Sequence, residues 1–173
     1  MRMAQVPGVC AIVVMGVSGA GKSTVGQLIA TRLDCPFRDA DSFHPPANIA
    51  KMQSGQPLAD DDRWPWLRAI AAWIAEHRAA GTTCVVTCSA LKRRYRDIIT
   101  DRQRPDVRLA YLTGGFDLIA ARLAARKGHF MPSALLKSQF DALEEPAADE
   151  RAITISIDAT PEDIAARVLG ELG

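Results

Sequence analysis

The sequence predicts an α/β fold in which a five-stranded parallel sheet lies between two layers of helices, a three-layer αβα arrangement. Short apolar segments alternate with longer segments of helical periodicity. The 173 residues suit one domain, 1–173. The first apolar segment also runs directly into a glycine-rich loop and a helix. Because parallel strands need crossover connections, this alternation favours a parallel sheet that helices cover on both faces.

Composition excludes several classes of protein. Hydrophobic residues make up 48% and charged residues 24% of the chain, and the formal net charge is +1. No overall field therefore favours nucleic acid or a membrane surface. No apolar run approaches the roughly 20 residues that a membrane-spanning helix needs. The four cysteines form no C-x-x-C pair, which is typical of reduced thiols. We expect a cytoplasmic protein that binds neither nucleic acid nor a membrane.

The first half of the chain contains two predicted strands and three predicted helices. The strands lie at 9–16 and 35–41, and the helices at 22–33, 46–55 and 64–80. The first strand is an unbroken apolar run, typical of a strand buried on both faces. Gly55 ends the second helix, and Pro65 suits the first position of the third.

The second half repeats the alternation. Strands are predicted at 82–89, 107–114 and 152–158, and helices at 90–100, 116–127 and 160–172. Thr160 is a plausible cap for the last helix, whose first turn carries acidic residues. We find no internal repeat and no linker between these elements.

Residues 16–23, "GVSGAGKS", match the phosphate-loop pattern G-x-x-x-x-G-K-[ST] between a predicted strand and a predicted helix. Backbone N–H groups of such a loop surround phosphate oxygens, and the helix N-terminus adds its positive dipole end. Lys22 would reach the outer phosphates, and Ser23 would bind the Mg²⁺ that bridges them. The predicted nucleotide-binding residues of this segment are Gly16, Val17, Ser18, Gly19, Ala20, Gly21, Lys22, Ser23 and Thr24.

A phosphate loop alone does not separate kinases from GTPase switches or motor ATPases. The chain has no N/T-K-x-D motif for reading guanine. The one candidate for a Walker B acid is Asp158, which comes after the fifth strand, and we place it on the base side of the nucleotide. A kinase for a small acceptor is favoured, and a nucleotide-binding switch with little turnover is the alternative from another class.

Residues 39–46, "DADSFHPP", follow the second strand. The carboxyl ends of strands in such a sheet face the ligand crevice. Asp39 and Asp41 are two apart on a segment predicted to be extended, so both carboxylates can face one site. One would hold the Mg²⁺ water shell, and the other would accept a proton from the acceptor hydroxyl. The alternative is a solvated turn whose aspartates cap the next helix. Ser89 and Lys92 leave the third strand at the same edge.

A second polar cluster follows at His44, Asn48 and Lys51, and continues to Arg63 after the acidic run 60–62. Asn48 and Lys51 are three apart on a helix, so they share a face. A guanidinium beside a catalytic crevice can bind a carboxylate through two hydrogen bonds. One alternative is that the acidic run is a solvated face that pairs locally with Arg63, and another is that the run only caps the helix that follows. The cluster indicates that the acceptor is an acid that carries hydroxyls.

The segment "RLAARKGHF" is strongly basic. Arg122 and Arg126 are four apart on one helix face, and a lysine, a glycine and a histidine follow. We expect a mobile cationic lid over the phosphates at about 122–138, where it would neutralise charge in the transition state. The alternative is an ordinary basic helix end that interacts with the helix dipole.

Together these segments resemble the gluconate kinase (gluconokinase) family, in the shikimate-kinase-like branch of P-loop small-molecule kinases. The stretch at 39–67, "DADSFHPPANIAKMQSGQPLADDDRWPWL", is similar to the family signature D-G-D-x-x-H-P-x-x-N-x-x-K-M-x-x-G-x-P-L-x-D-x-D-R-x-x-W-L. It would be the acceptor-binding region. "CSALKRRYRD", "RLAARKGHF" and "QFDALEEPAADE" also resemble family segments. The resemblance implies a P-loop NTPase-type fold and transfer of phosphate from ATP to the 6-hydroxyl of D-gluconate.

The resemblance also implies roles for individual residues. Mg²⁺ would lie near Ser23 and Asp39. Asp41 would hold the acceptor hydroxyl and act as the base. The catalytic set would be Lys22, Asp41 and Arg126. The sugar-acid pocket would be formed by Asp41, His44, Asn48, Lys51, Arg63 and Lys92.

On the nucleotide side, the resemblance implies that Arg122 and Arg126 serve adenine and phosphate from the lid. The loop from Asp158 to Pro161 would border the adenine. A homodimer is expected. One departure is visible, because Ala40 stands where the family has glycine between the two aspartates. If that position needs positive φ, alanine costs on the order of 1 kcal/mol. Another small acceptor, such as shikimate or a nucleoside monophosphate, is the nearest alternative.

Overall fold

The computed structural model describes residues 5–126 and 133–173. Its centre is a sheet of five parallel strands in the order β2-β3-β1-β4-β5, which confirms the predicted parallel sheet. The strands are β1 (Ala11–Met15), β2 (Phe37–Asp39), β3 (Cys84–Thr87), β4 (Val107–Thr113) and β5 (Ile153–Ser156).

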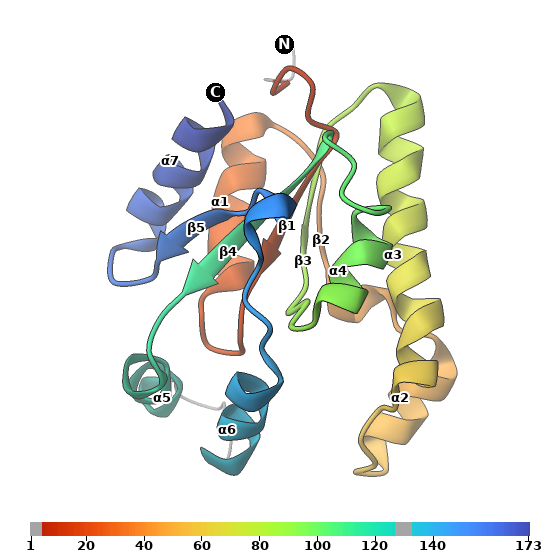
Figure 1. Ribbon diagram of the computed structural model, residues 1–173, viewed down its shortest axis with the longest axis vertical. Coiled ribbons are helices and arrows are strands. Elements are labelled where there is room, and N and C mark those ends of the chain that lie inside the picture. The colour runs from red at the N-terminus through yellow and green to blue at the C-terminus, as the bar shows by residue number, and fades with distance from the viewer. Residues whose placement is uncertain (1–4, 127–132) are drawn as a thin grey trace.

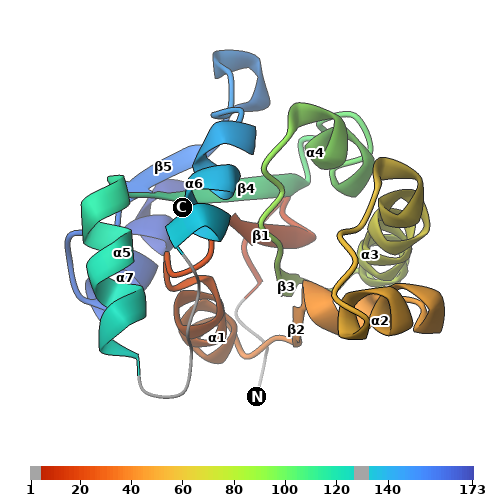
Figure 2. The same ribbon diagram turned by 90° about the horizontal axis from the view of Figure 1, so that it is seen from below.

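Helices cover both faces of this sheet. Figure 1 shows α1 and α7 on one face and α3 and α4 on the other, which confirms the three-layer arrangement. Figure 2 looks toward the carboxyl edge of the sheet, with α5 and α6 on one side and α2 on the other. The α-helices are α1 (Lys22–Leu33), α2 (Pro46–Gln53), α3 (Asp60–Ala80), α4 (Arg93–Ile99), α5 (Phe116–Ala125), α6 (Ser133–Ala142) and α7 (Pro161–Leu172), and short 3-10 helices lie at Ala40–Phe43 and Ala148–Glu150.

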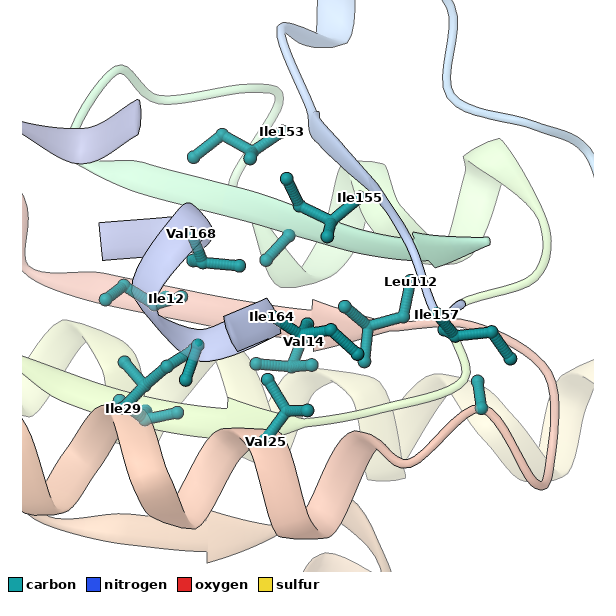
Figure 3. Packing of buried hydrophobic residues seen from close by; sticks show 14 of the residues in the cluster. Ile12, Val14, Val25, Ile29, Leu112, Ile153, Ile155, Ile157, Ile164 and Val168 are labelled. Atoms are coloured by element: carbon teal, nitrogen blue, oxygen red, sulfur yellow. The ribbon is translucent and has the colours of Figure 1, made fainter. Parts of the chain in front are cut away.

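The central strand β1 packs on both layers, as its unbroken apolar sequence predicts. Its five residues have no solvent-accessible surface. Ile12 and Val14 belong to the cluster between the sheet and the α1/α7 layer (Figure 3). Val13 packs in the opposite cluster, with Leu67 and Ile70 of α3. Burying a side chain of this size contributes about 1.5–3 kcal/mol, so the two layers fix β1 and the loop that follows it.

Helix α1 lies very close to the sheet at Gly26. A Cβ atom at this position would be 2.8 Å from Cε2 of Phe37 and 2.8 Å from Cγ2 of Thr87. Thr87 ends β3, and in register beside it lies Asp39, which ends β2. The close approach of α1 therefore holds two strand ends beside the loop from which the helix starts.

The third helix begins earlier than we predicted. Helix α3 starts at Asp60, so Pro65 lies inside the helix and not at its first position. The carboxylates of 60–62 stabilise the positive end of the helix dipole. Asp62 Oδ2 also accepts a hydrogen bond from the Ala59 N–H at 2.8 Å. These interactions outweigh the backbone hydrogen bond that proline cannot donate.

The strand predicted at 35–41 is shorter than expected. Strand β2 ends at Asp39, and Asp41 lies in the 3-10 helix Ala40–Phe43. Asp39 causes this turn, because its Oδ1 accepts a hydrogen bond from the Asp41 N–H at 3.0 Å. The premise that both aspartates share an extended segment was therefore wrong.

The region assigned to a lid contains a helix that we did not predict. Residues 122–125 belong to α5 and 133–138 to α6, while 127–132 lie outside the described residues. The mobility of this lid stays a prediction. None of the described helices is both long and apolar enough to cross a membrane.

Candidate active site

The phosphate loop joins β1 to α1 at the carboxyl edge of the sheet. Gly19 has φ +85°, and a Cβ there would lie 2.8 Å from Cγ of Leu123, so only glycine fits without strain. Val17 and Ala20 are buried beneath the loop. Helix α1 begins at Lys22, so its first N–H groups face the loop. The arrangement suits an anion held by backbone donors and a helix dipole.

The loop borders a cavity of about 450 Å³, here called the loop cavity. It brings together most of the residues predicted to act on phosphate and metal. These are Ser18, Gly19, Gly21, Lys22, Ser23, Thr24, Asp39, Asp41 and Arg126. Lys22 Nζ donates to the Val17 carbonyl at 3.1 Å. Burial lowers the pKa of Lys22, while Cys88, Asp39 and Asp41 oppose that shift.

Asp39 joins the loop to the sheet. Its Oδ2 accepts hydrogen bonds from the hydroxyls of Ser23 at 2.9 Å and Thr87 at 3.0 Å. Hydroxyl and carboxylate oxygens are ligands that Mg²⁺ prefers. The described residues contain no cluster of three His, Cys, Asp or Glu that could hold a metal. A cation here would rest on Ser23 and Asp39, with phosphate and water as its other ligands, and these residues fit it.

Asp41 lines the loop cavity, and its neighbour His44 lines a second cavity. The Asp41 side chain is 90% exposed, and its Oδ1 lies 4.0 Å from His44 Nε2. Nδ1 of His44 is 3.3 Å from the amide nitrogen of Asn48. Because that nitrogen can only donate, Nδ1 accepts and the imidazole proton is on Nε2, toward Asp41. The ring stacks on Trp66, with centroids 4.3 Å apart. Burial lowers the His44 pKa, so the ring is neutral at pH 7.

The second cavity, of about 340 Å³, is here called the basic cavity. His44, Arg63 and Lys92 line it, and these are three of the six residues expected to form the sugar-acid pocket. Arg63 Nη1 donates to Asp60 Oδ1 and to the Tyr95 hydroxyl, each at 3.3 Å. The local pairing that we held as the alternative is therefore present, and it fixes a guanidinium that also lines the cavity.

Asn48 and Lys51 line neither cavity. Lys51 Nζ donates to Asp62 Oδ2 at 2.7 Å, and the buried Asn48 amide donates to the Asp62 carbonyl at 2.9 Å. Both contacts join α2 to the first turn of α3, where Arg63 lies. In the described structure these two residues therefore hold α2 against the start of α3, next to the Arg63 that lines the basic cavity.

Arg122 and Pro161 also lie outside both cavities. Arg122 Nη2 donates to the Ile157 carbonyl at 2.5 Å, and Pro161 is the first residue of α7. Arg122 therefore holds the start of the loop that was predicted to border the adenine. Arg126 is the basic residue of this pair that lines the loop cavity.

Comparison with known proteins decides the family. A family model described as shikimate kinase matches residues 18–171. The thermoresistant gluconokinase of Escherichia coli K12 is 44% identical over 158 residues, which cover 91% of this chain and 90% of that protein. The gluconokinase of Gluconobacter oxydans is 46% identical over 151 residues, covering 87% and 84%. The chain belongs to the gluconokinase family. A solved gluconokinase from Sinorhizobium meliloti matches with a TM-score of 0.84 and 42% identity, covering 99% of this chain and 93% of that one.

The departure from the gluconokinase signature at Ala40 causes no backbone strain. Ala40 lies in the 3-10 helix, and it is absent from the described residues that have positive φ. Its side chain is buried, and its carbonyl accepts a hydrogen bond from Trp66 Nε1 at 2.7 Å. The Ala40 methyl group therefore packs in the core. Because φ is not positive here, the backbone penalty considered above does not arise.

Among the residues that line the two cavities, the sequence analysis did not name Trp66, Thr87, Tyr95 and Gln139 as site residues. Thr87 could have been found, because it ends a strand at the ligand edge. Trp66 lies in the helix predicted at 64–80, where no site residue after Arg63 was expected, yet it lines both cavities. Gln139 begins the segment "QFDALEEPAADE", which resembles the family, but no role was assigned to it, because α6 was not predicted.

Proposed function

We propose that the protein transfers the γ-phosphate of ATP to the 6-hydroxyl of D-gluconate and forms 6-phosphogluconate. One observation carries the proposal. The loop cavity, with its phosphate loop and paired aspartates, shares Trp66 and Ser89 with the basic cavity. A phosphate donor and an acidic acceptor bound in these cavities would meet at the common wall. The gluconokinase names of the relatives supply the acceptor.

The phosphate side of the reaction uses charge and position. Ser23 and Asp39 would hold Mg²⁺, which neutralises charge on the β- and γ-phosphates when it is bound. Lys22 Nζ would leave the Val17 carbonyl for the outer phosphates. Arg126 would add a second positive charge from the edge of the loop cavity. Both cations would stabilise charge on the transferred group more strongly in the transition state than before it.

The acceptor side needs a base at the common wall. Asp41 is exposed, and it is the carboxylate nearest to the neutral His44 ring. We assign Asp41 the proton that the 6-hydroxyl loses as its oxygen attacks the γ-phosphorus. The Nε2–H of His44 would orient the Asp41 carboxylate or an acceptor hydroxyl.

The basic cavity would hold the rest of the acceptor. Arg63 and Lys92 would bind the gluconate carboxylate. This contact would place the 6-hydroxyl, at the other end of gluconate, beside Asp41. Asn48 and Lys51 would act through α2 and α3. Arg122 and Pro161 would act through the loop that borders the nucleotide base. A cytoplasmic homodimer belongs to the same proposal, and light scattering of the purified protein tests the dimer.

ADP release in the presence of Mg²⁺ and ATP tests the reaction. The acceptors to compare are gluconate, other aldonates, shikimate and nucleoside monophosphates, with a sample without acceptor as the background. We expect ADP release to depend on gluconate, and the product to carry phosphate on the 6-oxygen. A rate with gluconate equal to the background would rule the proposed reaction out.

A further inference from the structure

Gln139 of α6 is bound to the phosphate loop. Its Oε1 accepts a hydrogen bond from the Ser18 N–H at 2.7 Å, and its Nε2 donates to the Ser18 hydroxyl at 2.9 Å. The two residues are 121 positions apart in the sequence. Because a backbone N–H can only donate, the first contact fixes which end of the amide is oxygen. The side chain is thus held in one orientation on the third residue of the loop.

The same side chain lines the basic cavity and not the loop cavity. Gln139 lines this cavity together with Ser138, Arg63 and Lys92. A carboxamide has two N–H donors and two lone pairs on its oxygen. The contacts among the described residues use one of each. One donor and one acceptor therefore remain for a polyhydroxy ligand in this cavity.

The end of α6 is also fixed to the wall of the basic cavity. The Glu144 N–H donates to the Leu91 carbonyl at 2.7 Å, and the Arg93 N–H donates to Glu144 Oε2 at 2.9 Å. These bonds flank Lys92. Helix α6 therefore touches the phosphate loop through Gln139, and the segment that directly follows it touches the wall of the basic cavity through Glu144. Together they connect the two cavities through short hydrogen bonds.

We propose that Gln139 couples the two substrate sites, because it holds Ser18 of the phosphate loop with one half of its amide and binds hydroxyls of the acceptor with the other half. The inference rests on gluconate as the acceptor. Phosphate in the loop fixes Ser18, and Ser18 fixes the Gln139 amide. The acceptor then meets an oriented partner, so nucleotide binding strengthens acceptor binding, and the reverse holds by linkage.

Calorimetric titration of gluconate, with and without Mg²⁺ and a non-hydrolysable ATP analogue, measures this coupling. Gln139→Met keeps the length and helix propensity of the side chain but has no amide. We expect the variant to bind gluconate about 3- to 10-fold more weakly, the effect of one hydrogen bond. In the variant, gluconate should bind with about the same affinity with and without the analogue. The affinity for the analogue alone should change by less than about twofold.

Asp141→Asn is the matched control, because Asp141 lies on α6 outside the predicted lid at 122–138, and its exposed side chain contacts only Lys137 among the described ion pairs. It should behave as the wild type. Gln139→Met with wild-type coupling would overturn the inference. So would equal losses of gluconate and analogue affinity together with a lower melting temperature, because these indicate a purely structural role. A wild-type protein that binds the analogue but not gluconate would contradict the proposed function, and the inference with it.

Discussion

The two aspartates that flank Ala40 have different surroundings, and this difference divides their roles. Asp39 accepts hydrogen bonds from two hydroxyls and a backbone N–H, so its oxygens point toward Ser23, Thr87 and the turn. Asp41 lines the loop cavity with an exposed side chain. A carboxylate held by donors suits a cation site, whereas an exposed one can accept a proton. This division comes from one 3-10 turn.

Replacing Asp41 tests the base. Asp41→Asn keeps the size of the side chain but cannot take the proton, so we expect kcat to fall roughly 10²- to 10⁴-fold. Binding of ADP, measured by calorimetry, should stay as in the wild type. Turnover close to that of the wild type would remove Asp41 from the role of base.

Arg63→Ala tests the carboxylate site. A hydrogen bond to a charged group contributes about 1.5–3 kcal/mol, so KM for gluconate should rise on the order of 10- to 100-fold. KM for ATP should change little. Arg94→Ala is the control, because Arg94 also pairs with Asp60, at 2.6 Å, but does not line the basic cavity. If both variants raise KM equally, the effect comes from the ion-pair cluster and not from the acceptor.

The imidazole of His44 makes stability depend on pH. Burial lowers its pKa below the ordinary 6.5, and Arg63 lowers it further, while Asp41 opposes them. The unfolded chain therefore binds this proton more tightly. The His44 contribution is complete above pH 6.5 and is lost as the pH falls through the lower folded pKa. We expect the free energy of unfolding in urea to decrease less between about pH 7.5 and about pH 5.5 for His44→Gln than for the wild type. Equal decreases in the two proteins would show that another group causes the lower stability at acid pH.

At the scale of elements, the junction of α2 and α3 carries the acceptor side. Asp62 accepts from the Ala59 N–H and from Lys51, and Asn48 donates to its carbonyl. The sequence pattern predicted both helices because their apolar spacing is local. It placed the start of α3 too late, because the acidic run was interpreted as lying before the helix. The dipole and the bond to Ala59 become visible only when the turn is folded.

Asp62→Ala tests this junction. Loss of a helix-terminal hydrogen bond costs about 0.5–2 kcal/mol, and Lys51 loses its partner as well. We expect a lower free energy of unfolding in urea and a higher KM for gluconate. Asp61→Ala removes an exposed acid from the same turn and should change stability less. Equal effects of the two substitutions would attribute the stability to the dipole alone.

At the scale of the molecule, a buried ion pair joins α4 to the 3-10 helix Ala148–Glu150, which is distant in the sequence. Arg96 and Glu150 are each 1% exposed, with Nε and Oε1 2.7 Å apart. Arg96 Nη1 also donates to the Ala90 carbonyl at 2.9 Å. Ala90 has φ +47°, an unfavourable conformation for alanine, and it directly precedes the segment that carries Lys92. The pair holds that segment in place.

Arg96→Met should therefore destabilise the protein by about 3–5 kcal/mol, because Glu150 is left buried without its partner. The double substitution Arg96→Met with Glu150→Met should recover much of that loss. Urea unfolding of both variants measures the difference. A single variant as stable as the wild type would show that water reaches Glu150 and replaces the guanidinium.

The sequence could predict the nucleotide half of the site more fully than the acceptor half. The phosphate loop is contiguous, and its spacing alone defines its chemistry. The basic cavity instead collects Trp66, Tyr95 and Gln139 from three helices, and their meeting depends on how the helices pack. Gln139 was beyond local reasoning, because its partner Ser18 is at the other end of the chain. Thr87 was within reach of the rule on strand ends.

The close approach of α1 to the sheet at Gly26 bears on how this enzyme could be engineered. A designer who wants a more heat-tolerant variant often replaces a helix glycine with alanine, which usually raises stability. Here the added methyl group would press on Thr87, and Thr87 is bonded to Asp39. The routine improvement of a helix would displace a carboxylate in the active site. In this protein, a substitution chosen to raise the thermal stability of α1 would therefore also change the position of Asp39.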